Sequence, residues 1–186
     1  MPANAQLTSV GKPKIGGAVF RAPLGTALPT DAKTALSEAY INMGYVSDEG
    51  MTNSKSREST EIKAWGGDKV RDAQTSKTDT FQGKFIEQRN LEVLKAAHGD
   101  DNVSEAGGII TIRENAKELD KAVWVIDQIP DGGYLKRIII PEGMGTNVGD
   151  VTYKDDEIIG YDLTISAYPH AEYENDTHRE FIEAGE

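Results

Sequence analysis

Alternation of apolar and polar side chains with a period of two is the feature that most constrains this sequence. Over residues 159–168, Tyr161, Leu163 and Ile165 fall on one side of an extended chain, and polar residues fall on the other. Phe81 and Phe85 repeat the pattern over residues 80–86. Successive side chains of a strand point to opposite faces, so the pattern predicts half-buried antiparallel strands.

Other apolar runs bounded by turn residues predict further strands. The expected strands are residues 61–65, 109–114, 122–129, 134–140 and 151–153. Pro130-Asp131-Gly132-Gly133 stands between two of them and is a strong turn signal.

Two segments have helical spacing and capping residues instead. In residues 30–40, Asp31 can cap the first turn and alanines form an apolar stripe. In residues 90–98, Asn90 can cap the start and Gly99 can end the helix.

These elements together favour a mainly β (α+β) fold, a sandwich or barrel with a packed helix. A length of 186 residues suits one domain over residues 1–186. We expect residues 1–13 to form an N-terminal arm and residues 170–186 a polar C-terminal tail.

Two polar stretches do not fit a compact domain. Residues 48–60 contain Met51 as their one apolar anchor, so we expect a long extended loop, functional or disordered. Residues 69–78 are compatible with a strand but polar on both faces. Such a strand suits a water-filled channel or a subunit edge, and an exposed hairpin is the simpler alternative.

Composition excludes several classes of protein. The chain has no cysteine, which rules out disulfides and thiolate metal sites and fits a reducing cytoplasm. Residues 1–10 lack the apolar core of a secretory signal, and no apolar run has the length of a membrane span. Residues 94–186 carry 8 basic and 20 acidic side chains, so they should repel nucleic acid.

No catalytic or metal-binding pattern stands out. His98, His170 and His178 lack zinc-type spacing, and His98 suits the end of a helix. The acidic cluster around Asp155 lacks the spacing of a calcium loop. Gly143-Met144-Gly145 lacks the strand–loop–helix context of a phosphate loop. The sequence therefore predicts no enzyme, no cofactor and no metal.

Several segments in order resemble the major tail protein family of phages with long, non-contractile tails. The segments are GKPKIGGAVFRAPLGTALPTD (11–31), GYVSDEG (44–50), EIKAWGGD (61–68), DTFQGKFIEQ (79–88), NLEVLKAAHGDDNV (90–103), GGYLKRIIIPEG (132–143) and VGDVTYKDDEIIGYDLTISAYP (148–169). No single piece is diagnostic, but the ordered set is fairly specific, and residues 170–186 lie outside it.

The resemblance implies a β-sandwich or barrel subunit with a flanking helix. Such subunits form hexameric rings that stack into a hollow tail tube around a tape measure protein, bounded by tail terminator and distal tail proteins. The tube conducts the genome into the host. The protein would be assembled in the host cytoplasm and reside in the virion, with no membrane partner.

With the resemblance, the two polar stretches acquire expected roles. Residues 48–60 would reach an adjacent ring and order on assembly. The expected inter-ring residues are Asp48, Glu49, Met51, Asn53, Lys55, Arg57 and Glu58. Residues 69–78 and part of 80–86 would line the lumen, which DNA crosses without adhering. The expected lumen residues are Lys69, Arg71, Asp72, Gln74, Ser76, Asp79 and Gln82.

Other readings stay open. A secretion-tube or contractile-tail tube subunit would need a surrounding sheath, and a tail terminator would stop at one ring. A β-sandwich module for carbohydrate or receptor would use Trp65, Trp124 or exposed tyrosines as stacking platforms, although both tryptophans also suit a core or a subunit contact.

Overall fold

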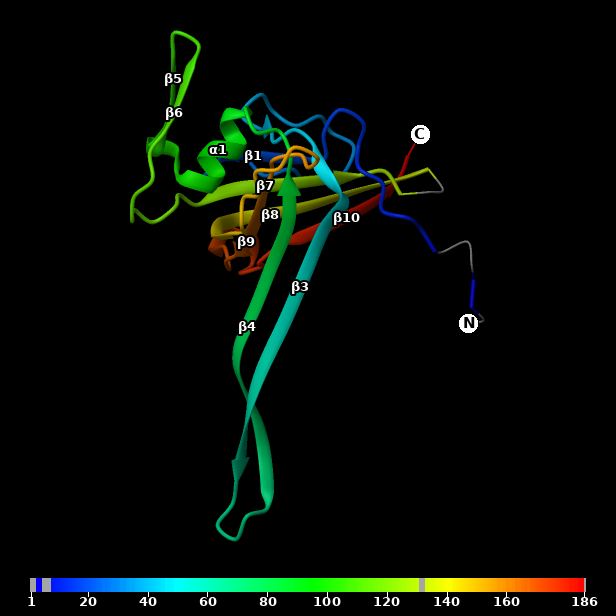
Figure 1. Cartoon of the computed structure of the whole chain (residues 1–186). Helices are drawn as coiled ribbons and strands as arrows, with labels where there is room; N and C mark the ends of the chain where they lie inside the picture. The colour runs from blue at the N-terminus through cyan, green and yellow to red at the C-terminus, as the bar shows by residue number, and fades with distance from the viewer. Residues whose placement is uncertain (1–2, 5–7, 131–132, 186) are drawn as a thin grey trace.

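The structure, a computed structural model, describes residues 3–4, 8–130 and 133–185 and is dominated by one antiparallel sheet (Figure 1). The strand order is β2-β1-β7-β8-β9-β4-β3, with β10 beside β8. The strands are β1 (Val19–Pro23), β2 (Ile41–Asn42), β3 (Val46–Lys63), β4 (Lys69–Phe85), β7 (Ala122–Gln128), β8 (Tyr134–Val148), β9 (Tyr161–Ala167) and β10 (Arg179–Ala184). A separate hairpin joins β5 (Val103–Ala106) and β6 (Ile109–Ile112). The mainly β prediction is confirmed.

Strand β8 connects the two halves of the sheet. Its first part pairs with β10 from Tyr134 to Ile139, and its last part pairs with β9 from Gly143 to Val148. The main core lies between the halves, where Phe81, Trp124 and Ile165 from three strands are almost fully buried. This burial follows the period-two pattern of the sequence.

Close packing fixes the backbone beside Trp124. The indole Nε1 donates a hydrogen bond to the Gly143 carbonyl oxygen at 3.2 Å. A Cβ atom added to Gly143 would come within 2.7 Å of Cδ1 of Trp124. A glycine at position 143 therefore lets β8 pass close to the tryptophan. This packing requirement, and not a phosphate loop, accounts for Gly143.

The one α-helix of the described residues, α1 (Leu91–His98), closes the core as predicted. The side chain of Asn90 accepts a hydrogen bond from the amide of Glu92, and Gly99 follows the last turn with φ of 97°. Arg21 on β1 holds the helix against the sheet, because its guanidinium forms ion pairs with Glu92 at 3.3 Å and with Asp100 at 2.8 Å.

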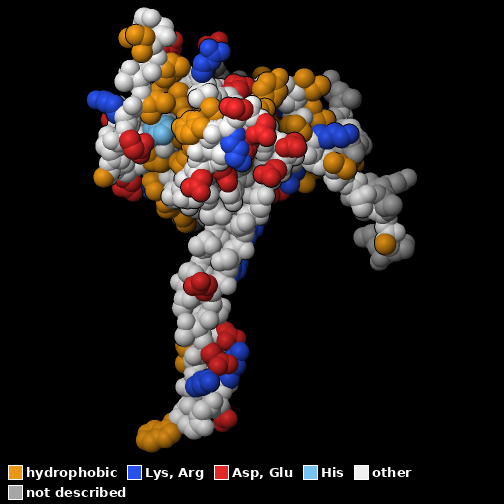
Figure 2. Space-filling model, viewed as in Figure 1, with side chains coloured by type: hydrophobic (Ala, Val, Ile, Leu, Met, Phe, Trp, Pro, Cys, Tyr) orange, Lys and Arg blue, Asp and Glu red, His pale blue; other side chains and the backbone are white. Residues whose placement is uncertain are grey.

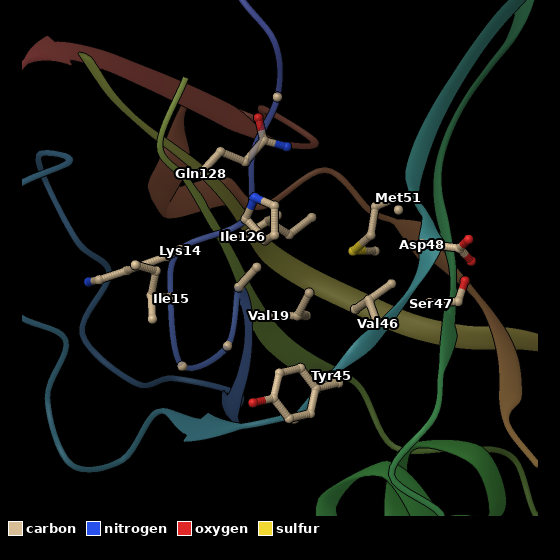
Figure 3. A pocket seen from close by; sticks show the side chains of 17 residues that line it. Lys14, Ile15, Val19, Tyr45, Val46, Ser47, Asp48, Met51, Ile126 and Gln128 are labelled. Carbon is tan, nitrogen blue, oxygen red and sulfur yellow. The ribbon is translucent and has the colours of Figure 1, made fainter. Parts of the chain in front are cut away.

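The sheet does not close into a complete barrel, and its open side forms a groove (Figure 3). β2 and β3 are the two ends of the sheet and are separated in the chain by residues 43–45 alone. Beside them lies a cavity of about 460 Å³, bounded by the start of β3, by residues 11–19 and by the end of β7.

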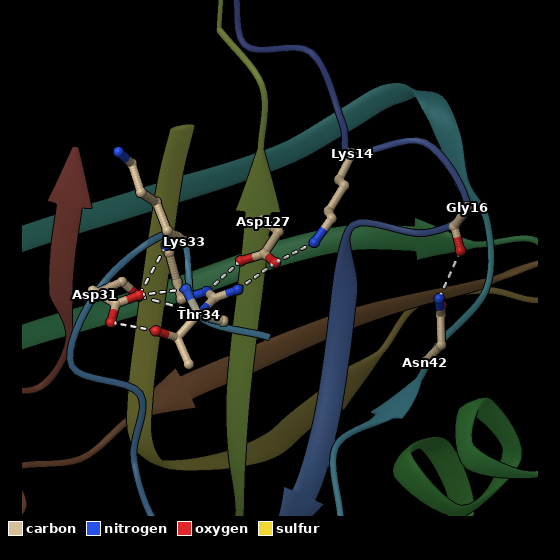
Figure 4. A network of polar contacts seen from close by, with 8 residues as sticks. Lys14, Gly16, Asp31, Lys33, Thr34, Asn42 and Asp127 are labelled. Carbon is tan, nitrogen blue, oxygen red and sulfur yellow. Dashed lines mark hydrogen bonds and ion pairs between the residues drawn. The ribbon is translucent and has the colours of Figure 1, made fainter. Parts of the chain in front are cut away.

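The predicted helix over residues 30–40 is wrong, although its capping interaction forms. Oδ1 of Asp31 accepts hydrogen bonds from the amides of Lys33 and Thr34 at 2.8 and 2.6 Å (Figure 4). The carbonyl oxygens of Asp31 and Thr34 then accept from Arg137 at 3.2 and 2.8 Å. A helix would need those carbonyls for its own amides, so the segment instead covers the sheet as an irregular chain.

The remaining segments differ from expectation mainly in extent. Residues 48–60 are not a loop but most of β3. Of the expected strand 61–65, residues 61–63 end β3, and 64–65 belong to the turn. Residues 69–78 and 80–85 belong to β4. Residues 151–153 form no strand. The predicted turn at Pro130-Asp131-Gly132-Gly133 includes residues 131–132, which lie outside the described residues. The expected tail contains β10 and is part of the sheet.

Arg137 is a buried polar residue that joins β8 to β7 and to residues 31–34. Its side chain is 1% exposed and forms a bidentate pair with Asp127 at 2.7 and 2.9 Å. Replacing it with alanine leaves that carboxylate buried with Lys14 as a longer partner at 3.5 Å. We expect Arg137→Ala to lower the free energy of unfolding by about 3 kcal/mol in urea titrations. Exposed Lys33→Ala is the control, and equal losses would contradict the prediction.

Candidate functional site: an arm, its anchor and a hydroxyl-lined face

Strands β3 and β4 form a hairpin that extends far beyond the body (Figure 1). β4 pairs with β9 over Thr80–Phe85 alone, so from Asp79 outward β3 and β4 pair with no other strand of the described residues. At about 3.3 Å per residue, the free part is roughly 35 Å long. We call this free ribbon, residues 53–79, the arm.

The arm has no core of its own. Residues 52–72 are all exposed, so backbone pairing and cross-strand contacts hold the two strands together. Among these contacts, Ser56 bonds Thr78 at 3.1 Å, and the Lys69 ammonium pairs with Glu61 at 3.3 Å. A two-stranded ribbon is marginally stable by itself in water, so the arm calls for a partner surface.

The arm ends in an exposed apolar tip, which we define as residues 62–70. Its turn is closed by hydrogen bonds between Ala64 and Asp68 at 2.8 Å and between Gly67 and Ala64 at 3.0 Å. Trp65 is fully exposed at 106%, and Figure 2 shows a hydrophobic group at the end of the arm. Ile62 and Val70 beside it are also exposed.

A buried carboxylate fastens the base of the arm to the C-terminal segment. Asp79 is 3% exposed and accepts hydrogen bonds from Asn53 at 2.8 Å and from Thr177 at 2.6 Å. Nδ1 of His178 lies 2.5 Å from the same carboxylate, and its ring packs edge-on against Phe81. The arm therefore leaves the body from a fixed point.

Hydroxyl and amide side chains line the sheet face opposite the core. We define this hydroxyl face by Thr52 and Ser54 on β3, Thr80 and Gln82 on β4, Thr146 on β8, and Thr164 and Ser166 on β9. Asp162 is the carboxylate among them, and it accepts from Gln82 at 2.9 Å. Lys84 is neutralised by Glu157 at 3.1 Å. The face is thus wettable with little net charge.

The structure distributes the expected inter-ring residues along β3. Asp48 lies at the groove, Glu49 is exposed, Met51 packs on the core, and Asn53 belongs to the anchor. Farther out, Arg57 donates to Gln74 at 3.4 Å and Glu58 accepts from Ser76 at 3.1 Å. Lys55 lies opposite Asp79. The outermost residues, above all Trp65, were not in that set, although Gly66-Gly67 between two polar strands was a signal for a turn.

The expected lumen residues do not share one face. Ser76 and Gln82 fall on the side of the hydroxyl face, opposite Glu58 and Thr52. Lys69 and Asp72 form an ion pair of 3.1 Å near the tip, where Arg71 is exposed, and Gln74 bonds Arg57. Asp79 is a correction, because burial in the anchor removes it from any wall.

Three other kinds of feature would indicate a different function: a metal site, a membrane span and a sugar-binding platform. The described residues contain no group of three or more side chains with metal-ligating atoms, and no helix long and apolar enough to cross a bilayer. Trp124 is 1% exposed, so it cannot serve as a stacking platform for a sugar. Trp65 remains accessible, at the end of the arm.

Comparison with protein-family models gives a match over most of the chain. A family model described as phage tail tube protein matches residues 9–182. The match includes most of the C-terminal segment that the sequence resemblance had left out. No curated protein matches the chain.

The anchor makes the base of the arm sensitive to acid. Burial raises the pKa of Asp79, but hydrogen bonds from Thr177, Asn53 and His178 outweigh it and hold the pKa below its ordinary value of 3.8. The stabilisation is therefore complete well above pH 3.8 and lost as the pH falls through the lowered pKa. In urea titrations across this pH range, Asp79→Asn should weaken the dependence of the free energy of unfolding on pH. Asp48→Asn, at an exposed position, should leave that dependence unchanged. Unchanged dependence in Asp79→Asn would contradict the prediction.

Proposed function

This chain belongs to the phage tail tube protein family, and we propose on that basis that its copies form hexameric rings that stack into the hollow tube of a phage tail. The tube subunit acts without catalysis and without a cofactor. It assembles in the host cytoplasm around a tape measure protein, and tail terminator and distal tail proteins bound the finished tube. DNA passes through the lumen during ejection.

The arm is the observation that carries the stacking part of the proposal. A ribbon of roughly 35 Å whose residues 52–72 are all exposed adds almost nothing to the core of the monomer. It suits a subunit that must contact copies beyond its own ring. Its fastened base keeps it in one direction, so every subunit of a ring presents its arm alike.

The hydroxyl face supports the conduit. A lumen wall must be wet without holding DNA, because each phosphate contact made by a basic side chain adds to the affinity. Threonine, serine and glutamine side chains satisfy this requirement, and Lys84 is already paired with Glu157. We assign the lumen wall to this face rather than to the full length of β4.

Shortening the arm tests the stacking. Residues 57–77 are replaced by Asn-Gly, a sequence suited to a two-residue turn, which joins the paired residues Ser56 and Thr78. We expect a folded protein by circular dichroism, since the removed residues are mostly exposed, and no stacked tubes by negative-stain electron microscopy. Replacing Gly107-Gly108 with Asn-Gly is the control and should leave tubes intact. Normal tubes from the shortened arm would refute its role.

Adding basic charge to the hydroxyl face tests the conduit. Thr52→Lys with Thr146→Lys puts two ammonium groups per subunit on this face, and we expect tubes of normal appearance but slower DNA ejection, with the delay reduced by added salt. The control is Ser104→Lys with Thr111→Lys, a cross-strand pair on the β5–β6 hairpin. Ejection as fast as in the unsubstituted phage would remove this face from the lumen.

A further inference from the structure

We propose that the groove at the open side of the sheet is a socket for the arm tip of a second copy of this chain, with Trp65 as the anchoring side chain. The inference rests on the proposed stacking of subunits and names the surface that receives the arm. Four observations support it. The tip is exposed and apolar, the groove has an apolar lining, the two lie far apart within one chain, and each carries a charged side chain without an ion-pair partner among the described residues.

The tip presents apolar area that the chain itself leaves uncovered. Trp65 is 106% exposed, Val70 66% and Ile62 47%. An aromatic side chain buries 150–250 Å² when it enters a pocket, and tryptophan is among the residues that most often dominate binding energy. Together, the three exposed side chains at the end of the ribbon form the apolar part of the tip, which we call the plug.

The groove presents a matching hollow. Val46 and Met51, which are partly exposed, line it, and the buried Val19 and Ile126 lie behind them (Figure 3). A volume of about 460 Å³ is about fifteen times the ~30 Å³ that one water occupies in the liquid, so an indole ring fits. Ile15 on the rim is 95% exposed, which adds apolar area that awaits a cover.

The tip cannot enter the groove of its own chain. β3 begins at the groove with Val46 and runs away from it to Lys63, and Figure 1 shows the tip at the far end of the arm. The plug and the hollow therefore meet between two copies. When two different patches of identical chains bind each other, each added copy leaves one patch free for the next copy. Unless the copies close into a ring, the assembly therefore grows, here along the direction of the arm.

Opposite charges accompany the two apolar surfaces. Asp48 is exposed at the groove, and Arg71 is exposed on β4 beside the tip. Neither side chain has an ion-pair partner within the described residues. When the tip lies in the groove, the guanidinium of Arg71 can reach the carboxylate of Asp48 of the other copy and fix the orientation of the plug.

Disulfide trapping tests the contact directly, because the chain contains no cysteine. Full-length Ala64→Cys, an exposed position beside the intact Trp65, is mixed under mild oxidation with full-length Tyr45→Cys or Asp48→Cys, two positions at the groove. A third mixture with Ile109→Cys, which is exposed on the β5–β6 hairpin, serves as the control. We expect at least about tenfold more crosslinked heterodimer at one or both groove positions than in the control.

Each result of this experiment decides the proposal. Yields equal to the control at both groove positions, or a dominant Ala64→Cys homodimer, would overturn the socket. Electron microscopy of the unsubstituted protein separates the two levels of inference. Tubes without preferential crosslinking would leave the tube function standing and remove the socket, and preferential crosslinking without tubes would support the socket alone.

Charge reversal tests the orientation of the plug. Asp48→Arg and Arg71→Asp should each reduce tube yield several-fold at low salt, and the double variant should restore it. Both positions are exposed, so neither change should affect the fold, as circular dichroism will check. Failure of the double variant to recover, after losses in both single variants, would remove this ion pair from the contact.

Discussion

The buried carboxylate of Asp79 is the interaction on which the rest of the arrangement depends. β4 leaves the core at this residue, with Phe81 packed inside on one side and the free arm on the other. Asn53 from β3 and Thr177 with His178 from the C-terminal segment converge on the carboxylate. Without this junction, a ribbon of roughly 35 Å would pivot about a few backbone hydrogen bonds, and its tip would sample a wide volume.

The fixed base of the arm favours binding by the exposed tip. Association costs conformational freedom, and a tip that already points in one direction loses less of it on binding. The arm itself is held by backbone pairing and short polar contacts such as Ser56 with Thr78. Its marginal stability as an isolated ribbon agrees with the proposal that a neighbouring copy contacts the arm.

One sheet supplies two surfaces with different chemistry. Its inner face buries Phe81, Leu163 and Ile165 against the helix α1 and β7, whereas its outer face carries hydroxyl groups. The period-two alternation produces both at once, since each residue added to the core face brings a neighbour to the other face. A tube subunit can thus be stable as a single chain and still offer a wettable wall.

The sequence by itself determined the elements whose causes are local. Asn90 and Gly99 set the limits of α1, and alternation at residues 159–168 set β9, because capping and face selection act over a few residues. Tertiary structure decided the rest. Arg137 took the carbonyls that a helix at 30–40 needed, and residues 48–60 became a strand because 69–85 lie beside them and pair with their backbone. Backbone pairing leaves no trace in side-chain hydrophobicity, so the arm reads as a loop until its partner strand is placed in space.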